Sequence, residues 1–360
     1  MEYQKLKKIV IVLVIMLVLM IAGGIGAFAW YNSALKPLSK EENIIRIEIT
    51  EGSGISGIAD TLEGKKIIRN ALVFKIYCKI NDVTNLQAGK YDLNTAEDMP
   101  TIIAHIVNGE IASDEVKITF IEGKNMKWYA KEIAEKTKNT EEDVYNLLKD
   151  EEYIDSLIEK YWFLEENIKN EDIYYPLEGY LLPDTYVFEN DEVSVATIFN
   201  VILNYMEKFL DEYKDNLDVS SIHDTLTLAS MAELEGKTLE DRQEIVGVFL
   251  NRIDIGMSLG SDVTTYYAFS VDMADRNLTK KEIDTYNPYN TRGPSMSGKI
   301  PVGPICNPSK VAIQAALEPI ETEALYFVAD KNGKVYFTNS NDEHINKIAD
   351  LKDEGLWYTY

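Results

Sequence analysis

Cysteine and histidine are scarce in this sequence. Its 360 residues include 2 Cys, Cys78 and Cys306, and 3 His, which are scattered at His105, His223 and His344. These residues lack metal-ligand spacing, so no metal site and no disulfide scaffold is expected. Two unpaired buried thiols are expected, with one Cys78 to Cys306 bridge as the alternative. H-E-x-x-H, G-x-S-x-G and S-x-x-K arrangements are also missing, which argues against a metalloprotease or a serine acyl enzyme.

Basic residues are outnumbered as well. There are 36 Lys plus Arg against 60 Asp plus Glu, a formal net charge of −24, so nucleic acid is not an expected partner. Two glycine-rich stretches resemble nucleotide-binding motifs only weakly. The glycines within 52–57 have no βαβ continuation, and the stretch 293–299 is followed by Ile300 where a P-loop needs Ser or Thr. No cofactor is therefore expected.

A long apolar run lies near the N-terminus. Residues 9–30 are uncharged and mostly apolar, and as a helix they extend about 33 Å, enough to cross a bilayer. Lys5, Lys7 and Lys8 precede the run, so we expect a single-pass anchor with a cytoplasmic N-terminus and an extracytoplasmic remainder. A cleaved signal peptide is the alternative, because Ala27 to Ala29 form an A-x-A site.

After a linker at 32–43, the pattern predicts a small α+β module over 44–110. Residues 44–50 alternate as a strand, 53–62, 71–80 and 99–107 read as helices, and 89–93 read as a returning strand. A connecting α+β region is expected over 111–192. It ends with PLEGYLLPDTYVF at 176–188, where Glu178 and Asp184 look like buried acids.

The region 193–360 contains the most informative stretch, a helix ending at Glu235. At 100° per residue, Leu228, Met231, Ala232 and Glu235 fall on one stripe. Gly236 is placed to end the helix, which puts Glu235 in the last turn, where unpaired carbonyls make the potential negative. Partial desolvation and this potential both disfavour the anion. We therefore expect a raised pKa for Glu235, as a general acid near neutral pH requires.

Polar and aromatic segments follow. Thr238 and Asp241 form a capping box that starts a helix to Ile255, with Asn251 near its end. Residues 259–269 are expected as a loop rich in hydroxyls and tyrosines, and YNPYNT at 286–291 has the same character, which suits a carbohydrate. Residues 324–329 and 334–338 predict a hairpin.

The ordered blocks of this chain resemble the MltG, or YceG-like, family of endolytic murein transglycosylases. The resemblance rests on LEGYLLPDTYVF at 177–188, LASMAELEG at 228–236, DRQEIVGVFLNRIDIGMSLGSD at 241–262, YNPYNT at 286–291, IPVGPICNPSKVAIQAALEP at 300–319 and YFVADKNGKVYFTNSNDEH at 326–344. Leu234 and Val263 depart from the residues that are common in the family at those positions.

The resemblance implies a membrane-anchored enzyme that cuts peptidoglycan glycan strands internally. It implies a LysM-like module followed by a catalytic domain with a lysozyme-like glutamate helix, in which the catalytic acid falls on Glu235. Peptidoglycan synthases are candidate partners. The candidate substrate-binding residues are Glu178, Asn251, Ser261, Asp262, Thr264, Tyr286, Asn287, Tyr289 and Asn339.

The expected reaction breaks the β-1,4 bond between N-acetylmuramic acid and N-acetylglucosamine without water, leaving a 1,6-anhydro end and terminating glycan elongation. A lysozyme-like muramidase that uses Asp262 as its second carboxylate is one alternative. A non-catalytic scaffold that binds glycan is the other.

Overall fold

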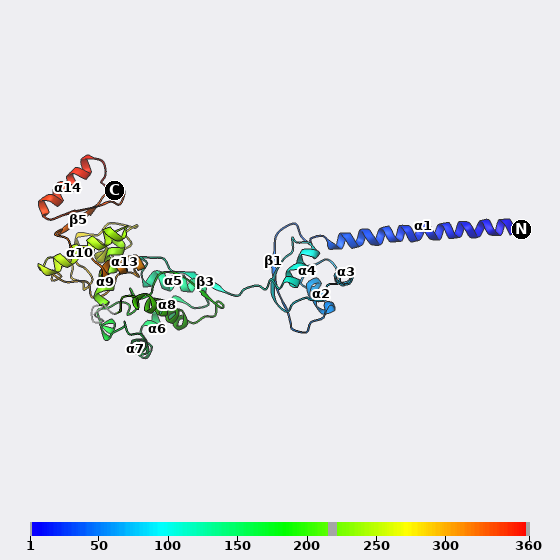
Figure 1. Cartoon of the computed structure of the whole chain (residues 1–360), viewed down its shortest axis with the longest axis horizontal. Coiled ribbons are helices and arrows are strands. Elements are labelled where there is room, and N and C mark those ends of the chain that lie inside the picture. Colours follow the sequence, from blue (N-terminus) through cyan, green and yellow to red (C-terminus); the bar gives the residue numbers. More distant parts are fainter. Residues whose placement is uncertain (1, 215–221, 358–360) are drawn as a thin grey trace. The chain divides into compact units, whose positions relative to one another are not determined.

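The computed structural model describes residues 2–214 and 222–357. The chain divides into two compact units, residues 1–114 and 115–360 (Figure 1). Both units combine helices with short antiparallel strands, so the mixed α+β class predicted from the sequence is confirmed. The finer division into five segments remains a prediction.

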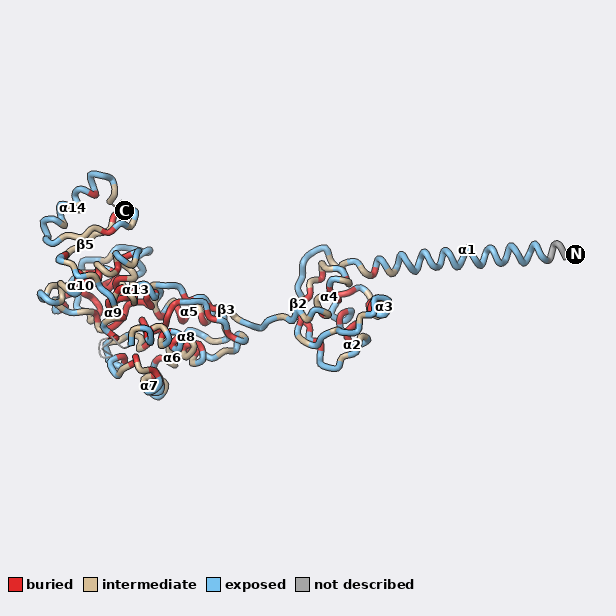
Figure 2. The backbone as a smooth tube through the Cα atoms, viewed as in Figure 1, coloured by how far each residue is buried: buried red, intermediate tan, exposed pale blue. Residues whose placement is uncertain are grey.

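The first unit begins with α1 (Glu2–Leu35), and Leu6–Leu35 is long and apolar enough to cross a membrane. The residues from Leu6 to Trp30 are exposed along the helix (Figure 2), as expected of an element that needs a surrounding apolar medium. The last turn differs, because Ala34 is buried against the rest of the unit, with Tyr31 and Leu35 packed beside it. This helix fits a single-pass anchor.

The rest of the first unit follows the predicted order of elements. β1 (Ile44–Ile49) pairs antiparallel with β2 (Gly89–Asn94), and α2 (Ile55–Gly64) and α3 (Ala71–Ile80) lie between them in the sequence. α4 (Met99–Asn108) comes last and is capped by Asp98, whose side chain accepts from the Thr101 backbone N–H. Alternate residues of both strands, including Ile47 and Tyr91, enter one apolar core with α2, α3 and α4.

The second unit is mostly helical. Its helices are α5 (Met126–Lys136), α6 (Glu141–Leu148), α7 (Glu151–Lys160), the 3-10 turn η1 (Glu166–Lys169), α8 (Val195–Leu210), α9 (Ile222–Glu235), α10 (Leu239–Asp254), α11 (Asp262–Ala268), α12 (Lys280–Ile283), α13 (Lys310–Leu317) and α14 (Asn341–Asp353). Two antiparallel pairs complete it, β3 (Val116–Thr119) with β4 (Thr185–Phe188) and β5 (Tyr326–Ala329) with β6 (Val335–Thr338). The predicted hairpin at β5 and β6 is confirmed.

Helix α9 is the centre of the second unit. It is buried from Leu226 to Ala232 and lies beside α10 and α13 (Figures 1 and 2), and α11 also packs against it. One of its sides contributes Leu226 and Ala229 to a core shared with α5 to α8, and the other contributes Met231 and Ala232 to a core shared with α10 and α11. The end of α9 is thereby fixed in position by both cores.

Two local predictions are wrong. Residues within 259–269 were expected as a loop, but 262–268 form helix α11, which packs Val263 and Ala268 into the core. Asp184 was expected to be buried but is exposed, because it precedes β4, in which Tyr186 and Phe188 take the inward positions. Its carboxylate instead accepts from the Thr185 backbone N–H at 2.7 Å.

Candidate active site

Glu235 is the last residue of α9, as predicted. The predicted apolar stripe is present, since Leu228, Met231 and Ala232 are all buried. Gly236 follows in a crowded place rather than in a left-handed conformation: a Cβ there would lie 2.9 Å from Arg242 Cγ and 3.2 Å from the Arg242 backbone nitrogen. Glycine therefore lets the chain turn directly against α10.

The carboxyl of Glu235 is held by Ser261. The Ser261 hydroxyl donates to Glu235 Oε1 at 2.6 Å. Burial raises the pKa of Glu235 above its ordinary value, and the nearby carboxylate of Asp262 raises it further, against the opposing influence of the Ser261 hydrogen bond and of Arg292 and Arg252. The direction agrees with the expectation from the sequence. Desolvation is its main cause.

A set of buried hydroxyls fixes Ser261. Its backbone N–H donates to Thr291 Oγ1 at 3.0 Å, and Thr264 Oγ1 donates to the Ser261 carbonyl at 2.7 Å. Thr264 and Thr291 also join their hydroxyls at 2.8 Å, and both are fully buried. Asn290 accepts from Thr265 Oγ1 on α11 at 2.6 Å and donates to the carbonyls of Glu282, Ile283 and Thr285, which ties residues 290–291 to both segments. The serine that contacts the acid is therefore preorganised.

Asp262 is exposed and paired. Its carboxylate lies 2.8 Å from Arg292 Nη1, and 58% of the Asp262 side chain is accessible. The same arginine nitrogen donates to the Gly260 carbonyl at 2.9 Å.

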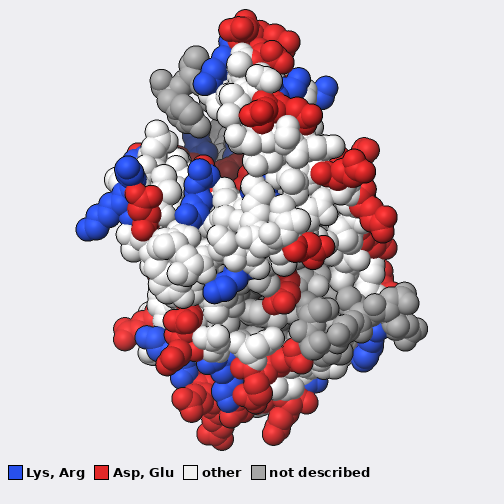
Figure 3. Space-filling model, turned by 90° about the vertical axis from the view of Figure 1, so that its left-hand side faces the viewer, with Lys and Arg blue, Asp and Glu red and all other residues white. Residues whose placement is uncertain are grey.

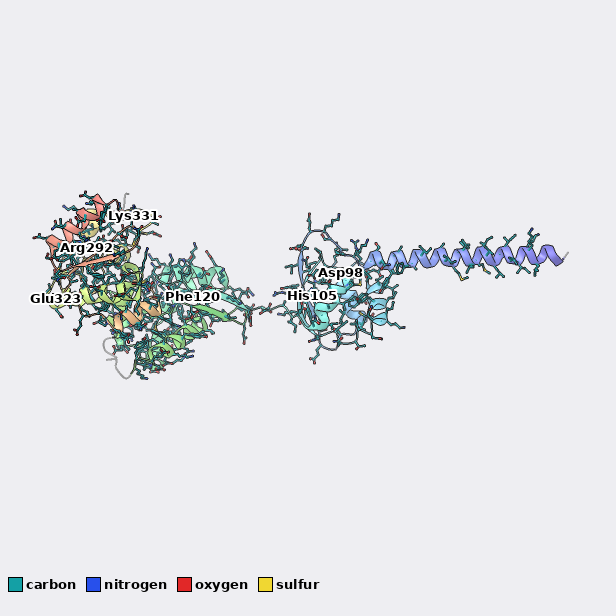
Figure 4. The ribbon with its side chains drawn as sticks, turned by 45° about the horizontal axis from the view of Figure 1, so that its top comes forward. Asp98, His105, Phe120, Arg292, Glu323 and Lys331 are labelled. Atoms are coloured by element: carbon teal, nitrogen blue, oxygen red, sulfur yellow. The ribbon has the colours of Figure 1, made fainter. Side chains whose placement is uncertain are left out.

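Figure 4 shows Arg292 in the same part of the unit as Glu323 and Lys331, which precede and follow β5. Figure 3 shows a recess on one face of the molecule with acidic atoms at its floor and basic side chains at its rim.

Glu178 is a fully buried carboxyl that belongs to a different cluster. It accepts from the Met126 backbone N–H at 2.9 Å, from the Tyr267 hydroxyl at 3.1 Å and from Asn307 Nδ2 at 3.2 Å. Burial raises its pKa to about 8, although the Met126 and Tyr267 donors favour the carboxylate. The neighbouring Gly179 has φ +86° and faces Pro304, whose Cβ an added Cβ would meet at 2.3 Å. Glu178 thus joins the start of α5 to α11 and to the segment before α13.

The other candidate residues are spread out. Asn251 Nδ2 donates to the carbonyls of Thr322 and Ala324 and so connects α10 to the segment before β5. Tyr289 is fully buried, while Asn287 Nδ2 donates to the Tyr174 hydroxyl at 2.8 Å. Tyr286 and Asn339 are exposed, and the Asn339 backbone N–H donates to Glu343 at the start of α14.

The structure therefore brings Ser261, Asp262 and Thr264 to Glu235 but gives Asn251 and Tyr289 roles within the fold. A substrate contact by any of these residues remains a prediction.

Sequence reasoning missed several residues around the acid. Glu233 is buried with Arg242, at 2.8 Å between Oε1 and Nη2, and also accepts from the backbone N–H of Ser309 at 2.9 Å. Arg252 and Arg292 contribute positive charge near Glu235. Only their positions in the sequence could have indicated that the two arginines lie near the acid, because Arg292 directly follows the YNPYNT block and Arg252 follows Asn251.

A groove lies beside the end of α9. It encloses about 440 Å³ and is lined by Leu234, Val263, Tyr266 and Trp128 among others. Leu234, in the last turn of α9, and Val263, in the first turn of α11, form part of its wall, while the carboxyl of Glu235 is turned to Ser261. Aromatic rings in such a groove suit the faces of sugar rings.

No group of three potential metal ligands occurs within residues 2–214 and 222–357. Cys78 and Cys306 are both buried and unbonded, which confirms the expectation of two unpaired thiols.

A partly buried carboxyl with a raised pKa at a helix end is typical of the general acids of enzymes that cleave glycosidic bonds. The chain belongs to the YceG-like family, whose model matches residues 47–350. It is 35% identical over 323 residues to a Bacillus subtilis protein named endolytic murein transglycosylase, covering 89% of this chain and 88% of that one.

Two further proteins are similar to this chain over most of its length. A Streptococcus pneumoniae protein of the same name is 29% identical over 96% of this chain, which spans 65% of that protein. A crystal structure of a YceG-like protein from Listeria monocytogenes matches with a TM-score of 0.60 and 34% identity, over 85% of this chain and 100% of that one. The chain is therefore similar to transglycosylases over most of its length.

Proposed function

We propose that this protein is an endolytic murein transglycosylase. It cleaves the β-1,4 bond between N-acetylmuramic acid and N-acetylglucosamine within nascent glycan strands, leaves 1,6-anhydro ends and thereby terminates elongation. The observation that carries the proposal is Glu235, a desolvated acid held by Ser261 at 2.6 Å in a chain 35% identical to a protein named for this activity.

In the proposed mechanism, Glu235 acts twice. The Ser261 hydroxyl donates to Oε1, which leaves Oε2 to carry the proton. Glu235 first gives this proton to the glycosidic oxygen. As a carboxylate it then takes a proton from the C6 hydroxyl of the muramoyl residue, whose oxygen attacks C1 and closes the anhydro ring. The leaving sugar keeps the first proton, so no water is consumed.

The state of Asp262 favours this reaction over hydrolysis. A glycoside hydrolase uses a second carboxylate roughly 5 to 9.5 Å from the acid as nucleophile or base. Asp262, the candidate for that role, is exposed and paired with Arg292 at 2.8 Å. Its negative charge is already partnered and helps to keep the proton on Glu235.

The proposal extends to where the protein lies and what it binds. Residues 9–30 anchor the chain with the N-terminus in the cytoplasm, and the module at 44–110 is LysM-like, supported by its strand, helix, helix, strand order. The region 193–360 is the catalytic domain with a lysozyme-like glutamate helix. Peptidoglycan is the substrate, and peptidoglycan synthases are the proposed partners.

The test is mass spectrometry of the products from uncrosslinked glycan strands. The wild type is compared with Glu235→Gln, which cannot transfer the proton, and with Glu240→Gln, which changes an exposed acid at the start of α10. Anhydromuramoyl ends from the wild type and from E240Q, but not from E235Q, are expected. Reducing ends would move the assignment to a muramidase, and unchanged cellular function in E235Q would indicate a scaffold.

A further inference from the structure

A second groove continues from the one beside Glu235. It encloses about 760 Å³ and lies between α5, the end of α6 and the segment 168–176. The two grooves share Lys127, Tyr174, Tyr175 and Ser270 in their walls. They therefore adjoin, and together they form a trough that has Leu234, from the last turn of α9, and Val263 in its wall at one end.

The trough is basic in an acidic protein. Its charged lining consists of Lys124, Lys127, Lys131, Lys149 and Lys169 against Glu171 and Asp272. The whole chain has the opposite balance, with 36 basic and 60 acidic residues. A groove lined by one sign of charge concentrates ligands of the opposite sign, so this trough suits an anionic ligand.

Three of these lysines lie on or just before α5, Lys127 and Lys131 on the helix and Lys124 two residues before its start. Lys124, Lys127 and Lys131 are three and four residues apart, and Trp128 lies between them on the same wall. All three lysines are exposed. Lys131 lies 3.7 Å from Glu135 in a pair whose side chains are more than half exposed, so this contact neutralises little of its charge. Lys169, by contrast, is closely paired with Asp155 at 2.6 Å.

Lys127 is held where the two grooves meet. Its Nζ donates to Ser270 Oγ at 2.9 Å, which joins α5 to the residue after the α11 cap. Ser270 adopts φ +54°, a left-handed conformation that glycine takes without strain and that costs other residues about 1 to 2 kcal/mol. The serine provides a hydroxyl for Lys127 that a glycine would lack.

We propose that this trough binds the carboxylate-bearing peptide stems of the glycan strand, so that the enzyme prefers strands that carry stems to strands stripped of them. The inference rests on the proposed function. Stems project from the muramoyl residues on both sides of the bond that is cut, and their carboxylates are opposite in charge to Lys124, Lys127 and Lys131. The Trp128 and Tyr175 rings offer apolar surface to the stem methyl groups.

The experiment uses the full-length chain in detergent micelles. The variant Lys124→Gln/Lys127→Gln/Lys131→Gln removes three positive charges from the trough. Lys208→Gln/Lys280→Gln/Lys281→Gln removes three from exposed positions on α8 and α12 and serves as the matched control. The quantity measured is the ratio of kcat/KM on stem-bearing strands to kcat/KM on strands stripped by an amidase.

The wild type and the control variant should share a ratio above one. The trough variant should lower this ratio about tenfold, the sum expected of three exposed charge pairs. High salt should lower the wild-type ratio in the same direction. An equal ratio in all three proteins, or an equal loss on both substrates, would overturn the proposal.

A binding measurement distinguishes a failure of this inference from a failure of the proposed function. Binding of both strand types is measured on the E235Q background, with and without the trough substitutions. If the wild type cleaves neither strand, the proposed function fails, and stronger binding of stem-bearing strands that depends on the three lysines still supports the trough. Tighter binding of a phosphate-rich wall polymer than of stem-bearing strands would overturn the assignment to peptide carboxylates.

Discussion

At the scale of single residues, two opposing influences contribute most to the pKa of Glu235. Burial raises the pKa, and the Ser261 hydroxyl, which stabilises the anion, lowers it. In Ser261→Ala the second influence is lost, so the pKa of Glu235 should rise further. The alkaline limb of the kcat profile, where the acid loses its proton, should move to higher pH. We also expect kcat to fall by roughly tenfold or more, because a hydrogen bond to a charged group contributes about 1.5 to 3 kcal/mol.

The control for that measurement is Ser156→Ala, which removes an exposed hydroxyl from α7. Its pH profile should match that of the wild type. If the alkaline limb of S261A stayed in place while kcat fell, Ser261 would act on the position of the substrate and not on the acid.

The raised pKa of Glu178 predicts that the stability of the folded protein depends on pH. Its pKa is raised to about 8 in the folded protein, above the ordinary value of 4.5, so the folded state retains a proton that the unfolded chain releases. The associated stability is fully present below pH 4.5 and is lost as the pH rises through about 8. Tm should therefore fall between pH 5 and pH 9, and this part of the fall should be missing in Glu178→Gln.

E178Q and the wild type should be compared by how steeply Tm falls with pH, and not by Tm at a single pH. The amide has one acceptor oxygen for the donors of Met126, Tyr267 and Asn307, so the variant should be less stable than the wild type at pH 5. Its Tm should nevertheless change less with pH. A slope equal to that of the wild type would show that other groups control this range.

Single residues differ in how far the sequence reveals them. Glu235 could be found because its neighbours 3, 4 and 7 positions away are apolar, a local pattern. Its partner Ser261 was a candidate, but the hydrogen bond between them spans 26 positions and depends on the path of the chain. The pairing of Glu233 with Arg242 and Ser309 was not predicted for the same reason.

At the scale of elements, the Glu233 carboxylate connects α9, α10 and α13. It pairs with Arg242 on α10 and accepts from the Ser309 N–H and hydroxyl at the start of α13. Both side chains of the ion pair are at most 10% exposed. Arg242→Ala should therefore leave a buried charge without a partner and lower the free energy of unfolding by about 3 to 5 kcal/mol. Urea denaturation measures this loss.

The double variant Glu233→Gln/Arg242→Met is the matching control. It removes both charges and keeps similar volumes, so it should lose less stability than R242A. Equal losses in the two variants would mean that Arg242 stabilises the fold by packing alone. The acid at position 233 therefore has a structural role, and the one at 235 has the proposed chemical role.

Elements with strong local signals were predicted well. The capping box of Thr238 and Asp241 is present at the start of α10, and the alternation of 44–49 matches β1. Helix α11 was missed because its seven residues are rich in β-branched and aromatic types, which favour strands. Its Ser261 N-cap makes no side-chain capping bond, since that hydroxyl is used by Glu235. The hydroxyl of this N-cap residue thus bonds the candidate acid and not the backbone of its own helix.

At the scale of the whole molecule, two units with separate cores should unfold separately. The core of residues 34–106 is distinct from the two cores of the second unit. Ala34 belongs to the first of these, which ties the end of α1 to that unit. We therefore expect Ala34→Asp to destabilise the first unit by several kcal/mol, because it buries a carboxyl without a partner. Calorimetry of the full chain in detergent should show one transition shifted down and one unchanged.

The matched control is Asn32→Asp, which adds the same charge at an exposed position two residues earlier. It should leave both transitions near their wild-type temperatures, since exposed substitutions usually change stability by within about 0.5 kcal/mol. A shift of both transitions in A34D would contradict independent units. If A34D shifts one transition alone, the end of α1 and the first unit form one folded body, and the second unit keeps its stability whatever happens at the N-terminal end of the chain.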